Sequence, residues 1–286
     1  MSPYMDLEGN FIISTLIPFL PHCCTLVINL KRETFHLLSE WHGFLGNLKV
    51  LQITDSISVD TNNAYSNNVL PIFELLPKLH QLSVVNISLT CIPLPSLTYL
   101  CHLHTNLSHS TSTLIDMLKQ TVTLKSLDIK CDVVMEHPAQ DEEDIVSLSL
   151  LTHLTLYETS WNECIPSFMS MLDLPSLQNL TLIFNGFSDG FLNIPFRTPQ
   201  LHLLQLHINI QQWIFNAAIY EDKLIHILES LPNLNVLYIG SRQYWPLLIE
   251  NIGGRSTFLP SLQCFDCLYH GTMTETWSSI LVYTLQ

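Results

Sequence analysis

The chain has 286 residues, of which 47% are hydrophobic and only 13% are charged, and its formal net charge is -14. A chain this apolar can bury enough surface to offset the entropy of ordering, so the composition excludes intrinsic disorder. Its 9 Gly and 15 Pro exclude a collagen-like protein, and the 25 acidic against 11 basic residues disfavour a nucleic-acid partner.

The N-terminal stretch from Asn10 to Leu30 carries no charge and is about long enough to cross a bilayer. Pro18 and Pro21 interrupt it, and it follows an acidic segment where a secretory signal would be basic. We therefore expect no membrane partner and interpret this stretch as the first unit of a repeat array.

Leucine supplies 52 residues, more than all charged residues together, and much of it recurs in one phrase. The phrase reads LPKLHQL, LPSLTYL, LPSLQNL and LPNLNVL at residues 76–82, 94–100, 174–180 and 231–237. Residues 177–185 and 201–209 also fit the leucine-rich-repeat pattern L-x-x-L-x-L-x-x-N. These matches predict a repeat protein.

One leucine of each phrase serves as a marker for its unit. The mean spacing of the markers is about 26.6 residues, within the range of about 20–29 that leucine-rich repeats show. The ten markers are Leu26, Leu51, Leu82, Leu100, Leu127, Leu154, Leu180, Leu204, Leu237 and Phe265.

Each marker predicts a short strand whose alternate side chains point to opposite faces. Leu180 and Leu182 would face the core, while Asn179, Thr181 and Ile183 would face outward. At the fourth marker this pattern fails, because His102 would point inward. A one-residue bulge that turns Cys101 and Leu103 inward would repair it.

Helical spacing between the strands predicts helices at Thr113 to Lys119, capped by Ser112 or Thr113, and at Asp222 to Ser230, capped by Asp222. A third helix would begin at Pro246 and end at Gly253 and Gly254. The expected fold is an α/β leucine-rich-repeat solenoid, or horseshoe, of about ten irregular units. Parallel strands would form its concave face and helices its convex face.

The expected domain organisation is an N-terminal tail, one solenoid, and a C-terminal tail or partial last unit, at residues 1–10, 11–270 and 271–286. Residues 56–68 and 134–144 read as loops. Within the C-terminal segment, the apolar residues 280–283 would leave an exposed end unless they fold back over the last unit.

Two groups of residues have metal-like spacing, but we expect no metal and no cofactor. Cys264 and Cys267 lie three apart on one strand and would face opposite sides, and no second such pair exists. Three histidines near Cys101 form the other group, in which His102 and His104 would share a strand face. The third is His109.

The eight cysteines are scattered without the terminal pairs of extracellular leucine-rich proteins, so we expect buried thiols at repeat positions and a cytoplasmic or nuclear location. The acceptor sites for N-glycosylation at Asn86, Asn106 and Asn179 would matter only in a secreted chain. The acidic run at residues 141–144 is expected to be a solvated loop.

No nucleophile constellation or phosphate-binding loop occurs in the sequence, so we do not expect an enzyme. The outward strand face is instead neutral, polar and lightly aromatic, which suits a protein partner. We expect aromatic and imidazole side chains to anchor that partner. The candidate partner-binding residues are Asp128, Lys130, His153, Tyr157, Thr181, Gln205, His207 and Tyr238.

The LPSL and LPNL phrases, together with TLKSLDI at residues 123–129, resemble the leucine-rich (RNI-like) region of F-box proteins, as in mushroom-forming fungi. The resemblance covers about Phe11 to Leu268. It implies recognition of a target protein for a cullin-RING ubiquitin ligase. Residues 1–10 are too few for an F-box, so binding to the Skp adaptor is expected only if an F-box lies upstream.

Two other functions remain open on the sequence. A free-standing intracellular scaffold, such as a regulator of a small GTPase, would bind a partner without the Skp adaptor. A secreted or membrane-tethered receptor fragment would be glycosylated at Asn86 or Asn106.

Overall fold

The computed structural model divides the chain into two compact units, residues 1–125 and 126–286, which are described separately. The structure describes residues 15–30, 38–41, 43–55, 76–87, 92, 97–107, 111–131, 145–158, 164–184, 200–208, 217–241, 246–254, 257–269 and 278–284. The expected loops at residues 56–68 and 134–144 lie outside these ranges.

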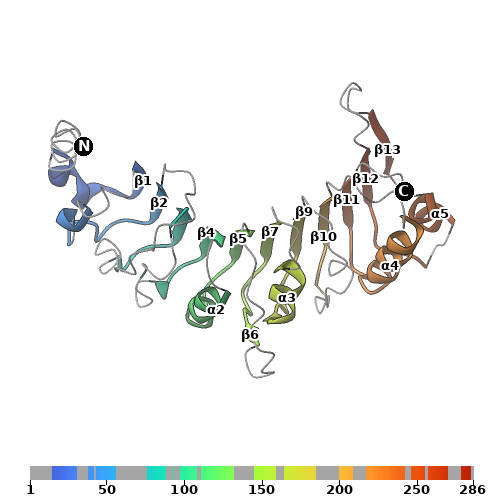
Figure 1. Ribbon diagram of the computed structural model, residues 1–286, viewed down its shortest axis with the longest axis horizontal. Coiled ribbons are helices and arrows are strands. Elements are labelled where there is room, and N and C mark those ends of the chain that lie inside the picture. Colours follow the sequence, from blue (N-terminus) through green and yellow to red (C-terminus); the bar gives the residue numbers. More distant parts are fainter. Residues whose placement is uncertain are drawn as a thin grey trace, which may run out of the picture. The chain divides into compact units, whose positions relative to one another are not determined.

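Unit 1 contains four parallel strands that follow one another in chain order (Figure 1). They are β1 (Thr25–Leu30), β2 (Val50–Asp55), β3 (Gln81–Val85) and β4 (His102–Leu107). A 3-10 helix, η1 (Ile17–His22), precedes β1, and the helix α2 (Thr111–Gln120) follows β4.

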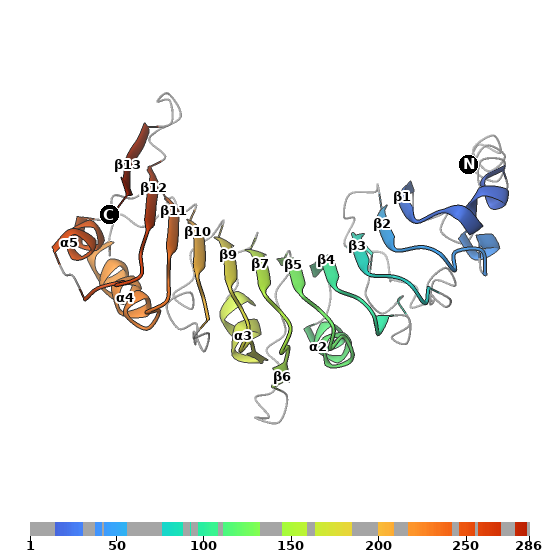
Figure 2. The same cartoon turned by 180° about the vertical axis from the view of Figure 1, so that it is seen from behind.

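Unit 2 contains six parallel strands in chain order, and a seventh strand folds back antiparallel on the sixth (Figure 2). The parallel strands are β5 (Ser126–Cys131), β7 (His153–Glu158), β9 (Asn179–Phe184), β10 (Leu203–Ile208), β11 (Val236–Ser241) and β12 (Cys264–Tyr269). The antiparallel strand β13 (Ser278–Thr284) contains the apolar residues 280–283, so this segment does fold back over the preceding strand.

The remaining elements of unit 2 are helices and one small sheet. The helices are α3 (Cys164–Ser170), α4 (Ala217–Glu229) and α5 (Pro246–Gly254), and the small sheet pairs β6 (Val146–Ser147) with β8 (Leu172–Asp173). The predicted α/β class with parallel strands is confirmed. Every helix in the described residues falls short of the length and apolar character that crossing a bilayer requires.

The marker leucines pair directly across neighbouring strands in both units. In unit 2, Leu127, Leu154, Leu180, Leu204, Leu237 and Phe265 form one continuous row. All six are at most 2% exposed. Because strand side chains alternate, the predicted inward and outward positions follow from this single register. Leu180 and Leu182 are buried and Asn179, Thr181 and Ile183 are partly exposed, as predicted.

The predicted marker of the fourth strand is wrong, because Leu103 and not Leu100 pairs with Leu82. No bulge is needed, since the strand begins three residues later than the phrase suggested. His102 and His104 therefore lie on the outward face, while Leu103 and Thr105 are buried. Cys101 lies before the strand and is partly exposed, so it is not an inward residue of the strand.

The wrong marker at the fourth strand arises from a tight turn that recurs along the chain. This turn ends three residues before a marker, as Leu79 does before Leu82. In it the fourth residue donates its backbone N–H to the carbonyl of the first, as from Leu79 to Leu76 (3.1 Å) and from Leu177 to Leu174 (3.2 Å). Proline suits the second position of such a turn, which explains the LPxL phrase. At the fourth strand the turn is formed by Leu97 to Leu100, one step after the phrase at 94–97.

Backbone hydrogen bonds tie each turn to the next strand. The carbonyl of Lys49, two residues before a marker, accepts the N–H groups of both His80 and Gln81, at 2.9 and 3.0 Å. The carbonyls of Thr152, Gln178, His202 and Asn235 each accept two N–H groups in the same way. These backbone hydrogen bonds alone align the start of each strand with its neighbour, whatever the side chains are.

Two of the three predicted helices begin earlier than the sequence suggested. The helix α2 begins at Thr111, so neither Ser112 nor Thr113 is its N-cap, and α4 begins at Ala217, so Asp222 is not an N-cap. Only α5 has the predicted bounds, because its Pro246 and glycine signals are both local. The backward extension is Thr111 and Ser112 in α2, and the mostly apolar residues 217–221 in α4.

The helices α4 and α5 lie side by side at the end of unit 2 (Figures 1 and 2) and are joined by a buried carboxylate. Glu221 on α4 is 3% exposed and accepts the backbone N–H of Leu248 at 2.8 Å. It thus satisfies a free N–H group in the first turn of α5. Burial raises the pKa of Glu221 above its ordinary value, although hydrogen bonds from Leu248 and Leu247 oppose the shift.

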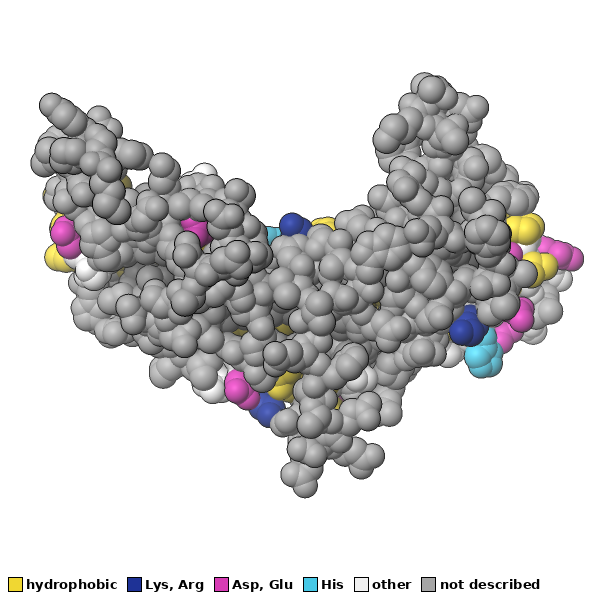
Figure 3. All heavy atoms as spheres, in the orientation of Figure 1, with side chains coloured by type: hydrophobic (Ala, Val, Ile, Leu, Met, Phe, Trp, Pro, Cys, Tyr) yellow, Lys and Arg dark blue, Asp and Glu magenta, His cyan; other side chains and the backbone are white. Residues whose placement is uncertain are grey.

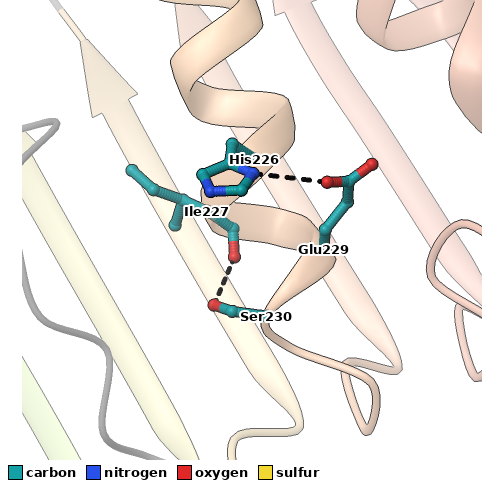
Figure 4. Close-up of polar contacts among 4 residues, drawn as sticks. All are labelled: His226, Ile227, Glu229 and Ser230. Carbon is teal, nitrogen blue, oxygen red and sulfur yellow. Dashed lines mark hydrogen bonds and ion pairs between the residues drawn. The ribbon is translucent and has the colours of Figure 1, made fainter.

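At the C-terminal end of α4, the side chains of His226, Glu229 and Ser230 are exposed, and Figure 4 shows their contacts. Ser230 donates its hydroxyl to the carbonyl of Ile227 at 2.6 Å, and His226 Nδ1 lies 3.4 Å from Glu229 Oε2. Since the His226 side chain is 89% exposed, this ion pair contributes little to stability.

In unit 1, polar side chains join the ends of three neighbouring strands. Asn86 has a left-handed backbone with φ of 62°, and its amide donates to the carbonyl of Asp55 at 3.1 Å. Asn106 Oδ1 accepts the backbone N–H of Asn86, and Asn106 Nδ2 donates to Asn86 Oδ1, both at 2.7 Å. Asparagine tolerates this φ and bonds to nearby backbone, so it suits the turn after β3.

We expect Asn106→Leu to lower the free energy of unfolding by about 1–3 kcal/mol, because it leaves the backbone N–H and the Oδ1 of Asn86 without partners in a largely buried site. Urea denaturation of the two proteins measures the difference. Asn29→Leu, on the exposed part of β1, is the control and should change stability little. Equal effects of the two substitutions would contradict the proposed role of the paired amides.

The raised pKa of Glu221 predicts a pH dependence of stability. Because the folded chain holds the proton more tightly than the unfolded chain, the free energy of unfolding should fall as the pH rises through the interval just above 4.5. Glu221→Gln keeps an oxygen acceptor for α5 but removes the charge, so this component of the pH dependence should disappear. Urea denaturation at several pH values compares the two proteins, and identical profiles would refute the prediction.

Candidate functional site

The outward strand face of unit 2, called here the strand face, consists of three rows of side chains set by the strand register. The first row is Ser126, His153, Asn179, Leu203, Val236 and Cys264. The second is Asp128, Thr155, Thr181, Gln205, Tyr238 and Asp266. A third row begins Lys130, Tyr157 and Ile183, two residues further along each strand.

The structure places seven of the eight predicted partner-binding residues on this one face. His153 and Lys130 are exposed, whereas Asp128, Tyr157, Thr181, Gln205 and Tyr238 are partly buried. His207 belongs to β10, but its side chain lies outside the described residues.

Neighbouring side chains of the second row interact directly. Thr181 donates its hydroxyl to Gln205 Oε1 at 3.1 Å, across the β9 and β10 strands. This bond leaves the amide nitrogen of Gln205 as a donor for another group. In the first row, His153 Nδ1 lies 2.8 Å from the hydroxyl of Thr152.

Both tyrosines of the strand face have a raised pKa. For Tyr157 the main cause is burial, followed by the charge of Asp128. For Tyr238 the main cause is an electrostatic interaction with Cys264, followed by burial, a hydrogen bond with Cys264 and the charge of Asp266. Both hydroxyls therefore stay neutral at physiological pH and can donate hydrogen bonds.

Asp266 was missed by the sequence reasoning, although the signal was present. It follows the marker Phe265 directly, as Asp128 follows Leu127, and this position always points outward. The residue pairs in register with Tyr238. Its atom Oδ1 is buried, and the described part of the chain provides no hydrogen-bond partner for this atom.

Among the described residues of unit 2, most exposed charged side chains lie on its helices, and Figure 3 shows charged side chains at the end that carries α4 and α5. Asp222, Lys223, Glu229 and Glu250 are all exposed there. The strand face, by contrast, carries only Asp128, Lys130 and Asp266 as described charged side chains. The few charges of the strand face lie beside its tyrosines, since Lys130 pairs with Tyr157 and Asp266 pairs with Tyr238.

The candidate metal ligands do not form a centre within the described part of the chain. His102 and His104 share a face of β4 as predicted, but among the described side chains no three metal-binding groups come together. The side chains of Cys267 and His109 lie outside the described residues.

The expectation of buried thiols is wrong for the four cysteines whose side chains are described. Cys24 is exposed, and Cys23, Cys101 and Cys264 are partly exposed. The reason is position, because none of the four occupies an inward site on a strand. All four are free thiols.

In two of the three glycosylation motifs, the asparagine amide already makes a hydrogen bond within the protein. Asn106 is 5% exposed, and its amide is hydrogen-bonded to Asn86. The amide of Asn86 in turn donates to the backbone of Asp55. Asn179 is partly exposed on the strand face.

Comparison with known proteins adds no functional assignment. No protein-family model matches the chain. No curated protein matches it in sequence.

Proposed function

We propose that the chain is a non-enzymatic leucine-rich-repeat recognition module that binds a target protein on its strand face. The proposed architecture is a horseshoe over residues 11–270, with the strand face on the concave side. One observation carries the proposal: a single register across six strands places polar and aromatic side chains in continuous rows on one face.

The size of this face supports protein binding. With neighbouring strands about 4.8 Å apart, the second row from Asp128 to Asp266 spans about 24 Å. Tyr157 and Tyr238 provide large side chains at separate places on the face, and both hydroxyls remain neutral donors. Aromatic side chains of this kind contribute a large share of binding energy in protein interfaces.

The resemblance to F-box proteins supports a specific role for this recognition. In that role the module holds a substrate of a cullin-RING ubiquitin ligase, and the Skp adaptor binds an F-box elsewhere in the full protein. An intracellular scaffold would use the same face without the adaptor. The two roles differ in whether the Skp adaptor is recovered together with the target.

Affinity purification of the tagged full chain, followed by quantitative mass spectrometry, tests target binding. We expect Tyr157→Ala and Tyr238→Ala each to reduce recovery of a bound target by about tenfold or more, the usual effect of losing an aromatic anchor. Calorimetry with the purified target should then give a lower affinity for each of the two variants than for the unsubstituted chain.

Tyr99→Ala is the matched control, because Tyr99 is 61% exposed and lies in a turn rather than on the strand face. Its partners should match those of the unsubstituted chain. If the strand-face variants retain every partner at full affinity, binding on this face is refuted.

A further inference from the structure

Tyr238 and Asp266 form a distinct pair at one end of the strand face. They are direct neighbours in the register of β11 and β12, so their side chains leave the sheet on the same side. Both residues are partly exposed. After Cys264 and burial, the Asp266 carboxylate also raises the pKa of Tyr238.

The Asp266 carboxylate lacks compensation for its charge. Its atom Oδ1 is buried, yet no group in the described residues donates a hydrogen bond to it. A buried oxygen of this kind costs free energy unless a donor or a cation is close. Because the charge is shared between both carboxylate oxygens, a cation on the exposed side of the residue would also compensate for Oδ1.

The neighbouring strands supply no such cation among the described side chains. The outward positions beside Asp266 in the register are Val236, Tyr238, Gly240, Cys264 and Leu268. The sequence of β13, on the other side of β12, contains no charged residue. Asp128 Oδ1 is likewise buried without a hydrogen-bond partner in the described part of the chain, but Lys130 lies two residues further along the same strand and faces the same side.

The tyrosine ring adds a second attraction for a cation. An aromatic ring has a negative face, which binds a cation within about 6 Å of its centre. The Tyr238 hydroxyl remains neutral, so it can also provide a hydrogen bond. A carboxylate beside an aromatic ring therefore favours a planar cation that can do both.

We propose that Tyr238 and Asp266 bind an arginine side chain of the target protein. The guanidinium group is planar, stacks on aromatic rings and is more weakly hydrated than an ammonium group, so it loses less on entering a half-buried site. This inference rests on the proposed function, since it specifies the chemistry of the partner on the same face.

Binding of ethylguanidinium, the end group of arginine, tests the site without a target protein. In two-dimensional NMR of the ¹⁵N-labelled full chain at 150 mM salt, the amide signals of Tyr238 and Asp266 should shift and saturate as ethylguanidinium is added. Neutral ethylurea should not shift them. Asp266→Asn should weaken the binding about fivefold, the size of one exposed ionic contact.

Asp222→Asn, on the exposed surface of α4, is the matched control for charge and should leave the binding unchanged. Tyr238→Leu should weaken the binding by severalfold, and Tyr238→Phe should retain most of it. Equal binding to the Asp266→Asn variant would overturn the proposal. Equal binding of ethylammonium would overturn the assignment to arginine.

Thermal melting provides a second measurement. If Asp266 is uncompensated in the free chain, Asp266→Asn should raise the melting temperature, while Asp222→Asn should leave it unchanged. A melting temperature several degrees lower for Asp266→Asn would show that the carboxylate already has a stabilising partner, and would overturn the proposal.

The outcomes separate this inference from the proposed function. If targets bind through Tyr157 and Tyr238 but ethylguanidinium does not bind, only the arginine site is refuted. If ethylguanidinium binds but Tyr157→Ala and Tyr238→Ala retain every target, the cation site exists and target recognition on the strand face is refuted.

Discussion

The row of buried leucines is the constraint on which each unit depends. Leu127, Leu154, Leu180 and Leu204 pair directly, and so do the leucines of unit 1. A shift of one strand by a single residue would expose its leucines and bury its polar side chains. The cost of burying unpaired polar groups therefore holds all the strands of a unit in one register.

This constraint also determines the chemistry of the surface. Once the leucines face inward, the residues between them must form rows on the other side. Neighbours such as Thr181 and Gln205 are then brought within hydrogen-bond distance although 24 residues separate them in sequence. Asp266 and Tyr238 meet for the same reason. The strand face is thus a consequence of core packing, and its side chains can differ without affecting the core.

The sequence predicted the strands well because their signal is local and repeats. Nine of ten markers are correct. The exception is the fourth, where the phrase LPSLTYL lies three residues earlier relative to its strand than the other phrases do. The phrase alone cannot show which of its leucines ends the turn, because Leu94, Leu97 and Leu100 are equally spaced, three residues apart. The pairing of Leu103 with Leu82 decides this, and it is a contact between distant residues.

Other features depended on contacts that no local pattern reveals. The cap of α5 comes from Glu221 on another helix, and the amide of Asn106 meets Asn86 from the next strand. Thiol burial was misjudged because cysteine was treated as a core residue regardless of its position relative to the markers. The outward position of Asp266 follows from the marker Phe265. Only the structure shows that its Oδ1 is buried without a hydrogen-bond donor among the described residues.

The recurring turn has a consequence for how such a chain can change in length. Wherever the turn is described, its last residue and the marker are three residues apart, as for Leu48 and Leu51 or Leu234 and Leu237. The distance from one marker to the next varies widely. Insertions after a strand would leave the rows of the strand face intact. One inserted residue between turn and marker would rotate every later side chain of that strand to the opposite face. Natural variants of this chain should therefore differ in length only outside these three-residue steps.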